Sequence, residues 1–128
     1  MRFLVDTHAF LWFVTDDPRL SATARTLMEP AENVLLLSPA SHWEIAIKLS
    51  TGKLTLAEPF RVLIPREIIL NGFQILGIEV EHSAVVATLP YHHRDPFDRM
   101  LISQAQVEGI PIISVDTQFD AYGITRLW

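Results

Sequence analysis

Short runs of apolar residues alternate along the chain with longer segments in which apolar residues recur every three or four positions. The short runs have the length of buried strands, and the longer spacing is typical of helices that cover a sheet. Strands are predicted at 2–5, 34–37, 74–78, 110–115 and 124–128. Helices are predicted at 7–14, 22–28, 40–50, 59–70, 82–89 and 96–108, with a helical turn at 118–122. This alternation predicts one α/β domain, residues 1–128, with a mostly parallel sheet.

The clearest helix boundaries surround the segment at 96–108. Asp95 is placed to cap its N-terminus, and Pro96 suits the first helical position because a missing N–H costs nothing there. Gly109 is a favourable residue to end the helix. Pro65 lies inside another predicted helix and is expected to kink or split it.

Composition excludes several classes of protein. Hydrophobic residues make up 49% of the 128 residues, which provides a core and excludes disorder. No apolar run approaches the roughly 18 residues needed to cross a bilayer, and the first residues do not resemble a signal peptide. The chain has no cysteine, which is compatible with the cytoplasmic location that we expect. Four aromatic residues are expected in the core rather than on a surface that stacks nucleobases: Phe10, Trp12, Phe13 and Trp43.

The net charge of the chain is −5. Proteins that bind nucleic acid by simple electrostatic attraction are normally basic, so this charge argues against that class. A cluster of four acids on one cation site would leave the rest of the chain nearly neutral. An RNA substrate is then compatible with the acidic total, because metal ions reverse the sign of the local field.

Two of the predicted strands are followed at once by an aspartate. Asp6 follows the strand at 2–5, and Asp116 follows the strand at 110–115. Ligands of parallel sheets bind beyond the carboxyl ends of the strands, so we expect both side chains at one edge. Each could equally cap the helical segment that follows it, and spacing alone does not decide between these interpretations.

Two further acids are candidates for the same site. Asp98 falls in the first turn of its helix, where an acid complements the helix dipole. The residues four and seven positions later, Ile102 and Ala105, are apolar, which places Asp98 toward the buried side. Glu44 precedes Lys48 by four residues, and a solvated ion pair is the simpler interpretation of that spacing.

A cluster of these acids would need a counter-charge. Carboxylates about 4 Å apart repel by roughly 4 kcal/mol at an effective dielectric constant of about 20. A protein keeps several of them together only with a proton, an arginine or a metal ion between them. Oxygen ligands suit hard cations such as Mg²⁺ or Mn²⁺, which activate water and stabilise displacement at phosphorus. The hypothesis from the residues is therefore metal-assisted hydrolysis of phosphodiester bonds.

The basic residues near these acids are weaker candidates. His92 and His93 are adjacent in a polar segment, and we expect them in a loop or on a helix surface rather than in a zinc site. Arg94 and Arg99 flank the acids and are candidates to contact phosphate. Arg99 could instead pair with Asp95.

Four blocks of sequence, taken together, resemble the PIN-domain family. They are FLVDTH at 3–8, WEIAIK at 43–48 with GKL at 52–54, DPFDRMLI at 95–102 and ISVD at 113–116. The blocks occur in the order found in the family and extend over nearly the whole chain. Within the family, they are most similar to the VapC-type toxins of bacterial and archaeal type II toxin–antitoxin systems.

The resemblance implies a three-layer α/β/α sandwich around the parallel sheet. It also implies an endoribonuclease that depends on Mg²⁺ or Mn²⁺, and several members of the family cut transfer or ribosomal RNA. A cognate antitoxin protein and a homodimer are the implied partners. Sequence-specific DNA binding would be a property of the antitoxin rather than of this chain, and the apolar segment 60–70 is a candidate contact surface.

The matched blocks also imply roles for individual residues. Four acids carry over as catalytic and metal-binding residues: Asp6, Glu44, Asp98 and Asp116. Asp6 and Asp98 would be the main metal ligands, and the other two would complete the cluster directly or through water. Thr7 and Ser114 match polar positions that support the acids by hydrogen bonds. Asp95 competes for the third acidic position, but the helix that follows aligns best from Asp98.

Two other classes of function share some of these features. A receiver-like signalling domain would use a strand-end aspartate as an Mg²⁺-dependent phosphate acceptor. Such a domain needs paired acids near the first strand and a lysine at the end of a late strand. In this chain Asp6 has no acidic neighbour, and no lysine follows Lys53. A non-catalytic binding partner would use the acids only to receive a basic peptide and would take up no metal.

Overall fold

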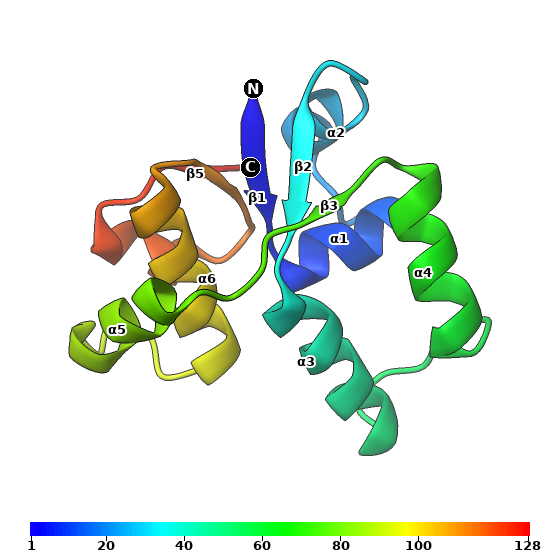
Figure 1. Cartoon of the computed structure of the whole chain (residues 1–128). Coiled ribbons are helices and arrows are strands. Elements are labelled where there is room, and N and C mark those ends of the chain that lie inside the picture. The colour runs from blue at the N-terminus through cyan, green and yellow to red at the C-terminus, as the bar shows by residue number, and fades with distance from the viewer.

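Five short parallel strands form the centre of the computed structural model, which describes residues 1–128 (Figure 1). Their order is β3-β2-β1-β4-β5, and all four neighbouring pairs are parallel. The strands are β1 (Arg2–Val5), β2 (Val34–Leu37), β3 (Gln74–Ile75), β4 (Ile112–Ile113) and β5 (Arg126–Leu127). The predicted parallel sheet is thus confirmed, although β3, β4 and β5 are shorter than predicted.

Six α-helices and one 3-10 helix connect the strands. They are α1 (Thr7–Val14), α2 (Ala22–Met28), α3 (Pro39–Ser50), α4 (Phe60–Leu70), α5 (Val80–Thr88), α6 (Pro96–Glu108) and η1 (Thr117–Tyr122). All were predicted, with ends that differ by at most two residues. The expected split at Pro65 is absent. Pro65 has no N–H to donate to the carbonyl of Arg61, but both residues are exposed, so water can satisfy that carbonyl. No helix is both long enough and apolar enough to cross a membrane.

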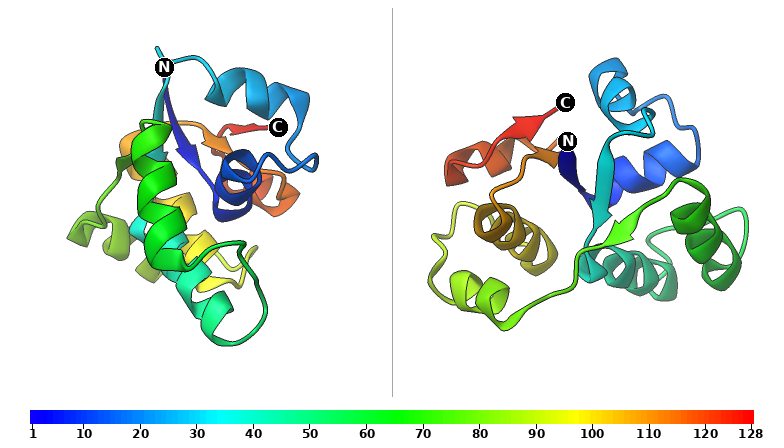
Figure 2. Two further views of the ribbon diagram at one scale, coloured as in Figure 1. Left: turned by 90° about the vertical axis from the view of Figure 1, so that its right-hand side faces the viewer. Right: turned by 45° about the horizontal axis from the view of Figure 1, so that its top comes forward.

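Alternate residues of β1 build two separate cores, one on each face of the sheet. Phe3 and Val5 belong to a core that also contains residues of α1, α2, α3 and α4. Leu4 points to the other face, where it packs with residues of α6 and η1. The second view in Figure 2 shows α5 and α6 on one side of the sheet and α1, α2 and α4 on the other. The predicted three-layer α/β/α sandwich is confirmed.

The strand register determines which residues meet at the carboxyl edge of the sheet. Val5 is the register partner of both Leu37 in β2 and Ile113 in β4. The residues that follow these three positions therefore emerge side by side: Asp6, Ser38 and Ser114. Helices α1 and α3 begin at this edge, where β1 and β2 end (Figure 1).

We expect Gly109→Ala to lower the free energy of unfolding by about 1 to 2 kcal/mol, because Gly109 ends α6 with a left-handed φ of 64° that disfavours a side chain. Gly77→Ala is the matched control, since Gly77 has no positive φ and an added Cβ there meets only one atom at 4.0 Å. Its stability should stay within about 0.5 kcal/mol. Urea denaturation measures both. Equal losses in the two variants would contradict the assigned conformation.

Candidate active site

Asp6 both caps a helix and lies at the sheet edge. Its Oδ1 accepts a hydrogen bond of 2.8 Å from the backbone N–H of Ala9, which caps α1. Its Oδ2 accepts from the hydroxyl of Ser114, the residue beside it in the register. Burial raises the pKa of Asp6, and the Ser114 and Ala9 donors oppose that rise. Asp6 therefore caps α1 and also lies at the sheet edge with Ser114.

Glu44 is buried in the middle of α3 and is held from both sides. Its Oε1 accepts a 2.8 Å hydrogen bond from the hydroxyl of Thr7, and its Oε2 lies 2.8 Å from Nζ of Lys48. The expected ion pair with Lys48 is present, but the carboxylate is buried rather than solvated. Thr7 directly follows Asp6, so its hydroxyl links the first strand end to α3.

Asp98 carries the least compensated charge of the cluster. Asp95 caps α6 and accepts from the backbone N–H of Asp98 at 3.0 Å, as predicted. Oδ1 of Asp98 takes part in none of the hydrogen bonds or ion pairs, and 23% of the side chain is exposed. Burial and the negative charges of the neighbouring acids, Asp95 first and then Glu44, Asp6 and Asp116, raise the pKa of Asp98 to about 8. The four predicted acids therefore lie close enough together for the other three to act on the charge of Asp98.

Asp116 follows β4 and caps η1. Its Oδ1 accepts a 2.9 Å hydrogen bond from the N–H of Gln118, and its own N–H donates to the Ser114 hydroxyl at 3.0 Å. Since that hydroxyl donates to Asp6, Ser114 connects two acids. The capping interpretation and the cluster interpretation again apply to the same side chain.

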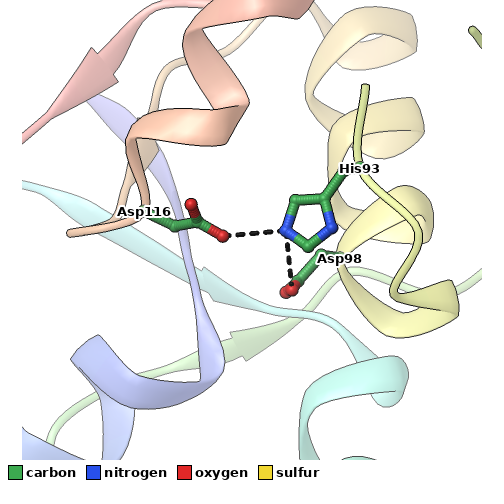
Figure 3. Close-up of side chains that lie close together, drawn as sticks. All are labelled: His93, Asp98 and Asp116. Carbon is green, nitrogen blue, oxygen red and sulfur yellow. Dashed lines mark hydrogen bonds and ion pairs between the residues drawn. The ribbon is translucent and has the colours of Figure 1, made fainter. Parts of the chain in front are cut away.

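His93 lies between Asp116 and Asp98 (Figure 3). Its Nε2 is 2.8 Å from Oδ2 of Asp116 and 3.1 Å from Oδ2 of Asp98, and only 8% of the residue is exposed. The prediction of a loop position is confirmed, and the contact of the side chain with the acids is a feature that the sequence did not reveal. The available signal was its place two residues before the capping Asp95, at the edge where the acids gather.

The two arginines are placed differently from one another. Arg94 is exposed and makes none of the ion pairs, so it stays a candidate to contact phosphate. Arg99 is only 4% exposed, and its guanidinium donates to four backbone carbonyls between residues 86 and 93. Arg99 therefore cannot reach a phosphate, and it does not pair with Asp95. Its position one turn before the buried Ile102 and Ser103 indicated this burial.

The aromatic residues also divide. Phe10 is fully buried, as predicted, and Trp12 and Phe13 pack against the same core. Trp43 is 61% exposed, so the prediction of a core position is wrong for this residue. Its ring meets Phe97 edge to face, with centroids 5.4 Å apart. Phe97 is half-buried, and the two rings belong to the residues that precede Glu44 and Asp98 in sequence.

A cavity of about 590 Å³ adjoins the cluster at Thr7 and Lys48. Basic and aromatic side chains also line it, among them His8, Trp12 and Lys53. Lys53 makes none of the ion pairs of the structure. The cavity therefore borders the two residues that hold Glu44 and has positive charge in its lining, although none of the four acids lines it.

The donor set fits a hard divalent cation. One carboxylate oxygen each of Asp98 and Asp116 lies within 4.8 Å of the other, and a ring nitrogen of His93 lies within the same distance of both. The open Oδ1 of Asp98 and the uncompensated negative charge around it are what a cation would satisfy. Carboxylate oxygens of this kind are the ligands of Mg²⁺ and Mn²⁺.

Comparisons with known proteins agree with this geometry. The model of the family described as PIN domain matches residues 3–124. Ribonuclease VapC16 of Mycobacterium tuberculosis is 38% identical over 71 residues, which are 52% of this chain and 50% of that protein. The chain therefore spans about half the length of this curated relative.

Solved structures share the whole fold at low sequence identity. VapBC2 from Rickettsia felis, in a crystal structure bound to a promoter DNA fragment, matches with a TM-score of 0.69 and 12% identity, over 98% of this chain and 97% of that one. VapBC-1 from nontypeable Haemophilus influenzae matches with a TM-score of 0.65 and 15% identity, over 98% of this chain and 96% of that one. FitAcB from Neisseria gonorrhoeae matches with a TM-score of 0.64 and 17% identity, over 98% of this chain and 96% of that one. At these identities the likeness shows the fold alone.

We expect the metal-free protein to lose stability as the pH rises from about 4 to about 8. The pKa of Asp98 is raised from 3.8 to about 8 in the folded protein, which keeps a proton that the unfolded chain has released. The unfolded state then binds fewer protons, and the free energy of unfolding falls with rising pH. Asp98→Asn should remove about 3 kcal/mol of the fall between pH 5 and pH 8, measured by urea denaturation in EDTA. An equal fall in both proteins would contradict the prediction.

Proposed function

This chain belongs to the PIN-domain family, and we propose that it is a metal-dependent endoribonuclease that acts as the toxin of a type II toxin–antitoxin pair. The observation that carries the proposal is the convergence of acids from three other segments on Asp98, which has one carboxylate oxygen open. The name of the relative Ribonuclease VapC16 supports RNA as the substrate. Mg²⁺ or Mn²⁺ is the proposed cofactor.

The proposed roles follow from how each acid is held. Asp98 offers its open Oδ1, and Asp6 and Asp116 lie beside it as further ligands, directly or through water. Glu44 completes the negative site while Thr7 and Lys48 fix its orientation. A bound divalent ion would lower the pKa of a water molecule and stabilise negative charge on the phosphate. Thr7 and Ser114 keep the carboxylates oriented for this chemistry.

The surroundings of the acids support a single-stranded or unpaired RNA segment as the substrate. Arg94 and Lys53 provide positive charge for the backbone on different sides of the site. The exposed ring of Trp43 is available to a nucleobase, since aromatic rings stack with any base.

Asp6 is poorly suited to the rival role of phosphate acceptor. It is almost completely buried, and both of its carboxylate oxygens accept hydrogen bonds. A phosphoryl donor would have to displace the Ala9 and Ser114 donors to reach it. The geometry therefore favours hydrolysis over phosphorylation of this aspartate.

An apolar surface supports a protein partner, for which we propose a cognate antitoxin. Exposed apolar side chains occur along the segment from α4 through β3 to the start of α5: Val62, Ile69, Leu70, Ile75, Ile78 and Val80. A neighbouring cavity of about 350 Å³ is formed by α4 with His42 and Ile75. The solved relatives VapBC2 and VapBC-1 are likewise described as complexes. A homodimer is the proposed oligomeric state, and DNA recognition is assigned to the antitoxin.

We expect the purified protein to cut a transfer RNA mixture with Mn²⁺ or Mg²⁺ and to stop in EDTA. Asp98→Asn should reduce kcat/KM at least about 100-fold, because it removes the open ligand oxygen. Glu32→Gln is the matched control and should keep full activity, since Glu32 is exposed in the loop before β2. Gel analysis of end-labelled RNA measures the cleavage. Undiminished cleavage by Asp98→Asn would refute the assignment of the site.

A small DNA-binding protein with a basic tail, encoded by a neighbouring reading frame, should co-purify with this chain and suppress its RNA cleavage. The acidic cluster attracts a basic tail, and the apolar surface on α4 gives the rest of the partner a contact area. Ile69→Asp should weaken co-purification at least about tenfold, because it places a charge in that surface. Glu58→Gln, an exposed change beside α4, should not weaken it. Unaltered binding of the Ile69 variant would exclude this surface.

A further inference from the structure

The imidazole of His93 joins two acids that come from different elements (Figure 3). Asp116 follows β4, whereas Asp98 lies in the first turn of α6. One nitrogen, Nε2, is within 2.8 Å of the first carboxylate and 3.1 Å of the second. When both carboxylates are ionised they repel one another, and a donor placed between them offsets that repulsion.

The other ring nitrogen indicates which role Nε2 can take. Nδ1 of His93 accepts a 3.3 Å hydrogen bond from the backbone N–H of Asp95. In a neutral imidazole one nitrogen accepts and the other donates, so the proton lies on Nε2. Nε2 then donates its hydrogen bond to Asp116, lies 3.1 Å from Oδ2 of Asp98, and has no lone pair to offer a cation.

The backbone of His93 is itself held in place by two buried side chains. Arg99 donates to the carbonyls of His93 and Pro90 at 3.2 and 2.9 Å, and to those of Val86 in the last turn of α5 and Leu89 just after it. The hydroxyl of Tyr122 accepts from the N–H of His93 and donates to the carbonyl of Pro90, both at 2.7 Å. A buried guanidinium is tolerated only with such partners, so the loop and Arg99 fix each other.

We propose that His93 is a positioning residue: its Nε2–H holds Asp116, and its ring lies against Asp98, so that both carboxylates are ready for a divalent ion that His93 itself does not bind. This rests on the proposed function, because it concerns the same metal site. The ring contacts Asp98 at Oδ2, 3.1 Å from Nε2, and leaves Oδ1 open. Hydrogen-bond partners of this kind, one step from the metal, are worth about 10- to 100-fold in metal affinity.

Three variants test the donor role by calorimetric titration of the metal-free protein with Mn²⁺, in the absence of RNA. His93→Leu removes the donor and should weaken Mn²⁺ binding about 10- to 100-fold. His93→Gln keeps an N–H near the position of Nε2 and should stay within about threefold of the unmodified protein. His92→Gln is the matched control and should not change binding, because His92 is exposed and its ring packs against Tyr122.

The unmodified protein provides a second measurement that does not depend on any variant folding. Pulsed electron paramagnetic resonance of bound Mn²⁺ should show no directly coordinated nitrogen. A coordinated nitrogen would overturn the proposal, since His93 would then be a ligand. Equal Mn²⁺ affinity of His93→Leu and the unmodified protein would also overturn it, as would a loss in His93→Gln as large as in His93→Leu.

RNA cleavage separates this proposal from the proposed function. The transfer RNA cleavage of His93→Leu should recover when Mn²⁺ is raised about 10- to 100-fold, because the defect is in metal affinity. Cleavage that stays lost at saturating Mn²⁺ would overturn the positioning role. Absence of Mn²⁺ binding by the unmodified protein would overturn both proposals. Mn²⁺ binding without any RNA cleavage would overturn the proposed function alone.

Discussion

Negative charge confined to a small, partly buried space is the constraint on which the rest of this structure depends. Three of the four acids have both carboxylate oxygens engaged: Asp6, Glu44 and Asp116. Asp98 has one oxygen free, and its pKa is raised to about 8. The chain's own donors therefore engage most of the carboxylate oxygens of the cluster. Oδ1 of Asp98 is left without a donor, and a cation would stabilise the cluster most at that atom.

The site is assembled from features that also make the fold. Asp6, Asp95 and Asp116 are all helix caps, and caps must stand where a strand or loop turns into a helix. In a parallel sheet these turns share an edge, so capping and clustering favour the same positions. Sequence spacing presents capping and site formation as alternatives. The parallel register brings the capping aspartates to one edge of the sheet, so the same side chains do both. Ser114 shows this directly, since its place beside Asp6 follows from the pairing of Val5 with Ile113.

Local signals predicted most of the fold, while long-range packing decided what they missed. The helix from Pro96 to Gly109 was predicted because its cap, its first residue and its last residue are all close in sequence. The lengths of β3 and β4 depend on pairing with distant strands, and they were overestimated. His93 was missed for the same reason, because a histidine in a polar loop gives no sign that Asp116, 23 residues later, will face it. Trp43 was placed in the core from hydrophobicity alone, which cannot distinguish a buried ring from an exposed one.

The misjudged role of Arg99 bears on how the proposed function would work. An arginine among acids suggests a phosphate contact, but the loop before α6 has carbonyls that need donors once they are buried, and Arg99 supplies them. Its charge is then unavailable to a substrate, and Lys48 is already paired with Glu44. With a net charge of −5, the chain offers an RNA phosphate little attraction at the cluster without a bound cation. Under the proposed function, metal binding and RNA binding must therefore be coupled, and residues that organise the acids affect the substrate without touching it.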